Sequence, residues 1–229
     1  MEPTEENIRA WDDAHRARAE PVELPPFVRA TLGDLTKKRV LHLHCGTGEA
    51  TAALAELGAV VTGVDARPAA LETARERWPK ILWVDGNPQS LPRQLRRHRF
   101  DLIYSGEGVL GHLDDLAGWA TGIVAALRER GELLVFDDHP VADCVDDFLR
   151  WRHDYFRDPV DPDRLWRVGQ VVSALVRAGL SIEALEEYPG GTARRRHDRR
   201  IPATFLLYAR RAAQPRQTRP KQTRPVSDT

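Results

Sequence analysis

Short apolar runs alternate along the chain with segments whose apolar residues recur every three or four positions. Residues 39–44 and 59–65 are apolar runs typical of strands that are buried on both faces. Between them, apolar residues at i, i+4 and i+7 predict a helix that ends at Gly58. Strands and helices in this order predict a parallel sheet that is covered by helices on both faces.

The same alternation continues beyond residue 65. Pro68 can begin a helix, because the first turn does not need its missing N–H group. A longer helix is expected after a cap at Asp114 or Asp115, with Leu127 on its buried face and its end at Gly131. Further strands are predicted at 81–86, 99–105 and 132–138.

The last part of the domain changes pattern. Residues 141–156 read as an amphipathic segment, which places Cys144 in a charged helical stretch. A helix over 165–178 precedes two strands, 180–188 and 204–210, which have no helix between them and should pair as an antiparallel hairpin. We therefore expect an α/β fold with a doubly wound, mostly parallel seven-stranded sheet and a terminal antiparallel hairpin.

The two ends of the chain differ from this domain. Residues 1–37 are expected to form an N-terminal helical cap, within which Trp11 lies on an otherwise polar helix. Residues 38–211 are the main domain. Residues 212–229 repeat the motif QTRP, and Val226 is their only large apolar residue, so we expect a disordered basic tail.

Charge and composition exclude several classes of protein. Lys plus Arg equals Asp plus Glu at 34 each, so nothing in the overall charge favours nucleic acid or an anionic membrane. No apolar stretch reaches the length of about 18 residues that a membrane span needs, and the N-terminus lacks the apolar core of a secretory signal. Cys45 and Cys144 are then expected to be free thiols of a cytoplasmic protein. The sequence leaves the oligomeric state open.

Gly46 and Gly48 follow the first predicted strand and precede a helix. Glycine permits a tight turn, and the helix presents free N–H groups to whatever binds there. A turn of this kind commonly holds a nucleotide cofactor. The dinucleotide fingerprint has Gly or Ala three residues after its second glycine, where this chain has Thr51, which argues against a nicotinamide cofactor.

Two acids end neighbouring strands. Asp65 lies 17 residues after Gly48, where an acid can take both hydroxyls of a ribose, although it could also cap the helix that begins at Pro68. Asp85 could accept a hydrogen bond from an adenine amino group. The alternative is a turn in which Asp85 bonds to the following backbone.

In combination, these motifs resemble the class I S-adenosylmethionine-dependent methyltransferases, in particular small standalone bacterial enzymes. The resemblance covers roughly residues 38–210 and rests on "VLHLHCGTGEATAALAELGAVVTGVDARP", "VDGNPQSLP", "RFDLIYSGEGVLGHLDDLAGW" and "LRERGELLVFDDHP". It implies the Rossmann-like methyltransferase fold and S-adenosylmethionine as the methyl donor. No metal is expected.

The resemblance also implies roles for individual residues. Glycines of the turn would hold the methionine end, acids the ribose and adenine, and the end of the fourth strand would line the sulfonium side. The implied cofactor-binding residues are His44, Gly46, Gly48, Asp65, Ala66, Asp85, Gly86, Asn87, Ser105 and Gly106.

Two histidines depart from the family pattern in the first strand. His42 stands where the family usually has an acid, and His44 where it has a glycine. His44 could donate a hydrogen bond to the cofactor carboxylate. For His42 we favour the interpretation of a packed strand residue over a contact with the cofactor's amino group.

Candidate catalytic residues follow the fourth and fifth strands, where ligands of such sheets bind. They are His139, His112 and Glu107. His112 could instead cap a helix, and Asp137 and Asp138 could merely solvate a strand end. Trp151 and Tyr155 are interpreted as core or lid residues rather than as a stacking surface for substrate.

The run "ARRRHDRR", residues 193–200, falls in the last hairpin loop. It is either a solvated loop or a means to capture an anionic group of the substrate, because Arg matches carboxylate and phosphate geometry. The sequence thus predicts methyl transfer to an unidentified small molecule. Two alternatives stay open: a protein that binds the cofactor without catalysis, and a nicotinamide-dependent oxidoreductase.

Overall fold

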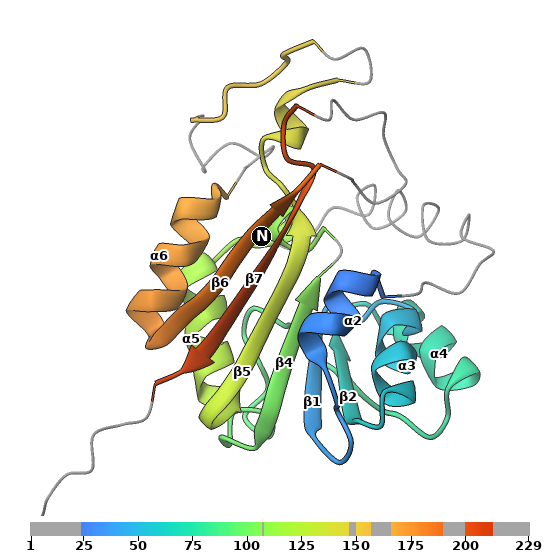
Figure 1. Cartoon of the computed structure of the whole chain (residues 1–229). Helices are drawn as coiled ribbons and strands as arrows, with labels where there is room; N and C mark the ends of the chain where they lie inside the picture. The colour runs from blue at the N-terminus through green and yellow to red at the C-terminus, as the bar shows by residue number, and fades with distance from the viewer. Residues whose placement is uncertain (1–23, 107, 147–149, 157–165, 190–199, 213–229) are drawn as a thin grey trace, which may run out of the picture.

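A computed structural model describes residues 24–106, 108–146, 150–156, 166–189 and 200–212. Seven strands form one sheet in the order β3-β2-β1-β4-β5-β7-β6 (Figure 1). The strands are β1 (Arg39–Leu43), β2 (Val60–Asp65), β3 (Leu82–Asp85), β4 (Phe100–Gly106), β5 (Leu127–Asp138), β6 (Leu180–Tyr188) and β7 (Thr204–Arg211). β1 to β5 pair in parallel, and β7 runs antiparallel to both β5 and β6. The predicted fold class is confirmed.

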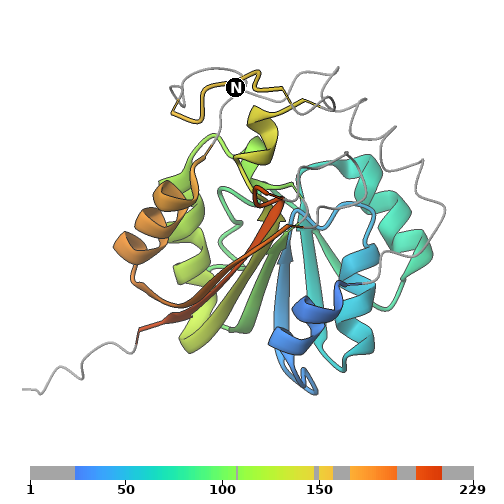
Figure 2. The ribbon, with the colours of Figure 1, turned by 45° about the horizontal axis from the view of Figure 1, so that its top comes forward.

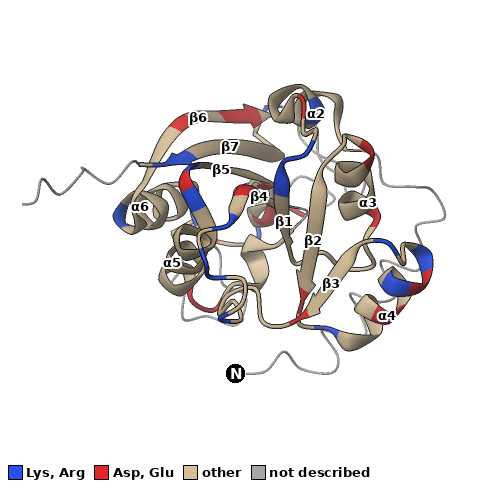
Figure 3. Cartoon of the chain, turned by 90° about the horizontal axis from the view of Figure 1, so that it is seen from below, with Lys and Arg blue, Asp and Glu red and all other residues tan. Residues whose placement is uncertain are grey.

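Helices cover both faces of the sheet (Figure 3). They are α2 (Pro26–Leu32), α3 (Glu49–Glu56), α4 (Pro68–Arg77), α5 (Leu116–Ala126) and α6 (Val168–Ala178), with 3-10 turns at η1 (Leu110–His112) and η2 (Ala142–Cys144). Successive strand residues point to opposite faces. In β1, Val40 therefore packs with α2 and α3, whereas Leu41 and Leu43 pack on the side of α5 and α6.

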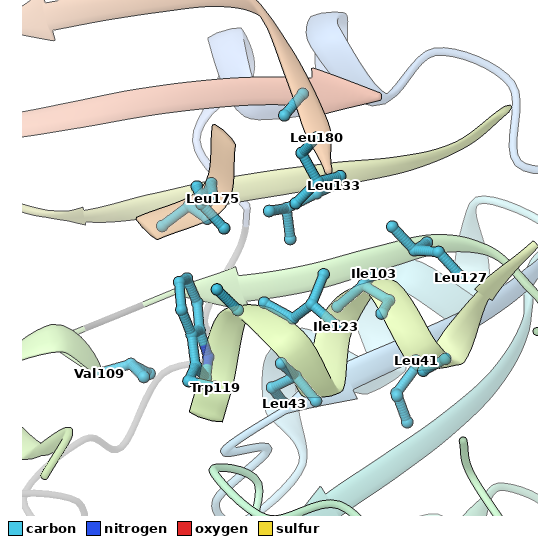
Figure 4. Packing of buried hydrophobic residues seen from close by; sticks show 14 of the residues in the cluster. Leu41, Leu43, Ile103, Val109, Trp119, Ile123, Leu127, Leu133, Leu175 and Leu180 are labelled. Atoms are coloured by element: carbon cyan, nitrogen blue, oxygen red, sulfur yellow. The ribbon is translucent and has the colours of Figure 1, made fainter. Parts of the chain in front are cut away.

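The larger core lies between the sheet and α5 and α6 (Figure 4). Trp119 and Ile123 of α5 are fully buried against it. On the other face, Phe27 of α2 stacks on Tyr188 of β6 with ring centroids 4.2 Å apart. Because both faces are covered by packed side chains, the carboxyl edge of the parallel strands is the part of the sheet left for binding.

The end of α5 differs from the prediction. α5 stops at Ala126, and β5 begins at Leu127 rather than at residue 132. Leu127 pairs with Phe100, but Leu102 pairs with Glu132, so β5 carries a bulge in this region. Leu127 is fully buried and continues the helical apolar spacing of Ile123, which is why periodicity alone misplaced the boundary.

The amphipathic segment after β5 also differs. η2 is followed by an isolated bridge between Val145 and Trp151, so Cys144 lies in a 3-10 turn and not in a charged helix. Its thiol is buried and reaches the carbonyl of Pro140 at 3.6 Å. Trp151 is 63% exposed, which excludes the interpretation as core. In Figure 2 this segment rises beyond the carboxyl end of β5.

Several predicted features lie outside the described residues. These are the N-terminal helix with Trp11, residues 193–199 of the arginine-rich run and the tail from residue 213. Within the part of the chain that the structure describes, no helix has the length and apolar character that a membrane crossing requires.

Candidate active site

The turn between β1 and α3 has three residues with positive φ. They are His44 at 54°, Gly46 at 56° and Gly48 at 96°. A Cβ on Gly48 would lie 2.6 Å from Trp83 Cη2, so this position excludes other residues by contact as well as by conformation. The turn therefore packs onto Trp83, while the N-terminus of α3 faces the carboxyl edge of the sheet.

Asp65 at the end of β2 holds this turn in place. Its carboxylate accepts hydrogen bonds from the Gly46 N–H at 2.8 Å, the Arg67 N–H at 3.0 Å and Arg67 Nε at 3.1 Å. Burial raises the pKa of Asp65, but the Arg67 charge and these donors outweigh it, so the pKa lies below its ordinary value. The structure thus gives Asp65 a local role, in addition to the predicted contact with ribose.

Asp85 lies beside Asp65 at the end of β3. The two residues are register partners, and the Gly86 N–H donates to the Asp65 carbonyl at 3.0 Å. Asn87 rather than Asp85 forms the turn, since its side chain accepts the Gln89 N–H at 2.8 Å. Among the described residues, the Asp85 carboxylate has no hydrogen-bond partner and is exposed. It is the acid of the pair that a ligand can reach directly.

The two histidines of β1 differ in their contacts. His42 is 3% exposed, and its Nδ1 lies 2.7 Å from Thr51 Oγ1 in the first turn of α3. Burial lowers the pKa of His42 to about 3, so the ring is neutral. His42 and Thr51, which both depart from the usual sequence patterns, thus bond to each other. His42 is a packed residue of the strand, as we expected.

His44 lies in the turn after β1. Burial lowers its pKa to about 4, against the opposing effect of the Asp65 charge. Its Nδ1 is buried and has no hydrogen-bond partner among the described residues. The same is true of Ser105 Oγ at the end of β4. Two buried polar atoms at this edge therefore have no hydrogen-bond partner among the described residues.

The segment after β4 crosses the carboxyl edge toward β3. Asp137 at the end of β5 accepts the N–H groups of Gly108 at 2.7 Å and Leu110 at 3.0 Å. Asp137 is 2% exposed, so the expectation that it solvates a strand end is wrong. Burial and the charge of Asp138 raise its pKa to about 7.

Comparisons with known proteins agree with this geometry. A family model described as a methyltransferase domain matches residues 40–131. An uncharacterized methyltransferase of Synechocystis sp. is 28% identical over 159 residues, covering 68% of this chain and 72% of the relative. A ubiquinone biosynthesis O-methyltransferase of Histophilus somni is 34% identical over 144 residues, covering 58% of this chain and 60% of the relative.

A solved structure agrees over nearly its whole length. The S-adenosylmethionine-dependent methyltransferase of Mesorhizobium loti has a TM-score of 0.65 and 26% identity, covering 81% of this chain and 96% of its own. Together, these comparisons support a class I S-adenosylmethionine-dependent methyltransferase. Its cofactor is S-adenosylmethionine, and the comparisons give no support to the nicotinamide alternative.

The residues of this methyltransferase fit that cofactor. The positive-φ turn leaves room for close backbone approach, and the buried polar atoms His44 Nδ1 and Ser105 Oγ have no protein partner among the described residues. Gly106 allows β4 to lie close to β5 at this edge, since a Cβ there would lie 2.6 Å from the Phe136 carbonyl oxygen. Within the described residues, no group of His, Cys, Asp and Glu could hold a metal ion.

The three catalytic candidates lie in different settings. Glu107 lies outside the described residues. His112 is exposed at the end of η1, and the helix cap is made by Asp115, whose side chain accepts the Gly118 N–H at 2.8 Å. His139 is 5% exposed, and both its ring nitrogens have protein partners.

Those partners fix the His139 ring. Nδ1 accepts the Val141 N–H at 3.2 Å, so Nε2 carries the proton and donates to Glu187 of β6 at 2.8 Å. Burial lowers the pKa of His139 against the opposing effect of Glu187. The sequence placed His139 near the acceptor, but the structure gives it no ring nitrogen free for proton transfer.

Sequence reasoning missed three polar residues of the site. Thr51 was considered only as a departure from a fingerprint, Asp137 as a solvated acid, and Gln89 not at all. Each bonds to a residue or backbone segment distant in sequence. The sequence offered a signal only for Asp137, which directly follows an apolar run.

Proposed function

We propose that this enzyme methylates a small molecule bound beyond the carboxyl ends of β4 and β5. The register pair Asp65–Asp85 beside the positive-φ turn carries the proposal, because it puts two acids where one nucleoside can reach both. The names of relatives support a small acceptor. Two are ubiquinone biosynthesis O-methyltransferases, and one is a demethylmenaquinone methyltransferase.

The turn and the acids bind and orient the donor in this proposal. Gly46 and Gly48 receive the methionine end, and Asp85, with Gly86 and Asn87, faces the adenine. Ser105 and Gly106 line the methyl side. When bound, the cofactor supplies an electrophilic methyl group on a sulfonium, so the protein's main tasks are to orient the nucleophile and exclude water.

Asp65 can take ribose hydroxyls only by exchanging partners. A carboxylate offers about four lone-pair sites, and Asp65 already accepts from Gly46 N, Arg67 N, Arg67 Nε and Arg67 Nη2. The two backbone bonds shape the turn. We therefore propose that the ribose hydroxyls replace the two side-chain bonds of Arg67 to the Asp65 carboxylate, with Ala66 beside the ribose.

For proton transfer from the acceptor we assign His112 rather than His139. Both ring nitrogens of His139 are bonded within the protein, and His112 is exposed on η1 at the end of the segment that follows β4. Glu107 would add a negative charge beside the sulfonium. Arg194, Arg195 and Arg196 are proposed to capture an anionic substrate group, so their replacement should raise the substrate KM without changing cofactor affinity.

Ligand-induced thermal stabilisation tests the proposal. S-adenosylhomocysteine should raise the melting temperature of the wild type, and NAD should not. A ligand that binds only the folded state stabilises the protein, and we expect NAD not to bind. The double variant Asp65→Asn/Asp85→Asn should lose this shift. Asp34→Asn should keep it, because among the described residues the Asp34 carboxylate bonds only to the nearby Thr36. Release of S-adenosylhomocysteine across a panel of phenols, amines and carboxylic acids then identifies the acceptor. An unchanged shift in the double variant would refute the proposed pocket.

A further inference from the structure

Residues 108–115, which we call the strap, connect β4 to α5 across the carboxyl edge of the sheet. Its apolar residues Val109, Leu110 and Leu113 are buried in the larger core, and Figure 4 shows Val109 near Trp119. Gly111 and His112 are exposed on its other side. The strap thus has one face fixed by the core and one face toward the proposed acceptor site.

Side chains from three other elements bond to the backbone of the strap. Asp137 of β5 accepts two of its N–H groups. Gln89, in the turn after β3, accepts the N–H groups of Asp114 at 2.6 Å and Asp115 at 3.1 Å. The Gln89 amide also donates to the His112 carbonyl at 3.3 Å, and Trp166 Nε1 donates to the Leu113 carbonyl at 2.7 Å.

Together with the backbone bonds of η1, these side-chain bonds take the place of the regular hydrogen bonds of a longer helix or strand. Backbone groups of an irregular segment are otherwise satisfied largely by water, which leaves the segment free to move. Here the bonds reach the strap from β5, from the turn after β3 and from Trp166, two residues before α6. The position of His112 is therefore fixed before any ligand binds.

We propose that Asp137 and Gln89 are positioning residues, which hold the strap as a preformed wall of the acceptor site. Neither touches the reacting atoms; both act through the strap backbone. The inference rests on the proposed function for the identity of the acceptor site, but the anchoring itself does not depend on it.

The two anchors should have different effects on the cofactor. Gln89 belongs to the turn whose Asn87 we assign to adenine, and its side chain joins that turn to the strap. Asp137 lies at the other end of the strap, and within the described residues its carboxylate bonds to no residue assigned to the cofactor. Loss of Gln89 should thus disturb strap and cofactor together, whereas loss of Asp137 should disturb the strap alone.

Residue-resolved hydrogen exchange together with cofactor affinity tests the proposal. Asp137→Asn puts an amide NH2 where one oxygen accepted an N–H group. We expect exchange at the Gly108 and Leu110 amides to become at least tenfold faster, with a Kd for S-adenosylhomocysteine within twofold of wild type. With any acceptor that the wild type methylates, kcat should fall at least tenfold while the KM for S-adenosylmethionine stays the same.

Gln89→Ala and a control complete the test. Gln89→Ala should accelerate exchange at Asp114 and Asp115 and raise the Kd at least threefold, and Asp34→Asn should change none of these values. Unchanged strap exchange in Asp137→Asn would overturn the proposal, as would faster exchange throughout the sheet or an unaffected kcat. If the wild type does not bind S-adenosylhomocysteine, the proposed function fails, and the exchange data still decide the anchoring.

Discussion

Two buried acids, Asp65 at the end of β2 and Asp137 at the end of β5, each hold one loop of the site in place. Their pKa values are shifted in opposite directions. Both acids are at most 3% exposed, and both accept backbone N–H groups from the loop of a neighbouring strand. The pKa of Asp65 lies below its ordinary value, whereas that of Asp137 is raised to about 7.

The difference lies in the neighbouring charge. Asp65 has Arg67, with Nε 3.1 Å from its carboxylate, and Asp137 has the like charge of Asp138. Burial raises the pKa of both acids; the charge of Arg67 opposes this effect at Asp65, whereas the charge of Asp138 adds to it at Asp137. Burial alone therefore does not tell whether an acid at a strand end is charged at neutral pH.

The largest expected effect comes from removing the cation beside Asp65. Arg67→Met leaves a buried carboxylate with backbone donors only, and we expect a loss of about 4 kcal/mol in the free energy of unfolding at pH 8. Urea unfolding measures it, with a Met substitution at Arg75, an exposed residue of α4, as control.

The pH dependence identifies the cause. A carboxyl group with a depressed pKa stabilises the fold above its unfolded pKa, and this contribution is lost as pH falls through the folded pKa. Without Arg67 the carboxyl protonates more readily, so the difference from wild type should shrink between pH 8 and pH 4. A difference that is the same at both pH values would exclude the ion pair as its source.

Replacing a glycine in each loop gives the next largest effect. Gly48→Ala should destabilise by about 3 kcal/mol, because positive φ strains alanine and the new Cβ meets Trp83. Gly108→Ala has a similar φ of 87°, but the nearest atom to its Cβ, Asp138 Oδ2, is 3.9 Å away. Strain alone then predicts about 1 kcal/mol. Thermal unfolding compares the pair, and equal losses would show that the Trp83 contact relaxes.

The smallest effect concerns the pH dependence that Asp137 imposes. Because its folded pKa is raised, the folded state retains a proton that the unfolded state loses, so wild-type stability falls as pH rises from about 4 to about 7. Asp137→Asn removes this dependence. Relative to wild type, the variant should gain on the order of 2 kcal/mol between pH 4 and pH 8. Urea unfolding at both pH values checks this, and a parallel change in the two proteins would contradict it.

The sequence by itself determined the alternation of strands and helices, the terminal hairpin and the glycine turn. These features depend on apolar spacing and on residues with special backbone freedom, both of which are local. The same reasoning failed at the start of β5, where the spacing of Leu127 fits a helix and a strand equally well.

Only the tertiary structure decided how the polar residues of the site are used. His42 bonds to Thr51, His139 to Glu187, and Asp137 to Gly108, which is 29 residues away in the chain. Burial, the partner of each ring nitrogen and the charge beside each acid arise when distant segments pack together. A residue's type and position in a motif state which chemistry is available, but the neighbours that the fold supplies decide whether it is used for structure or left for a ligand.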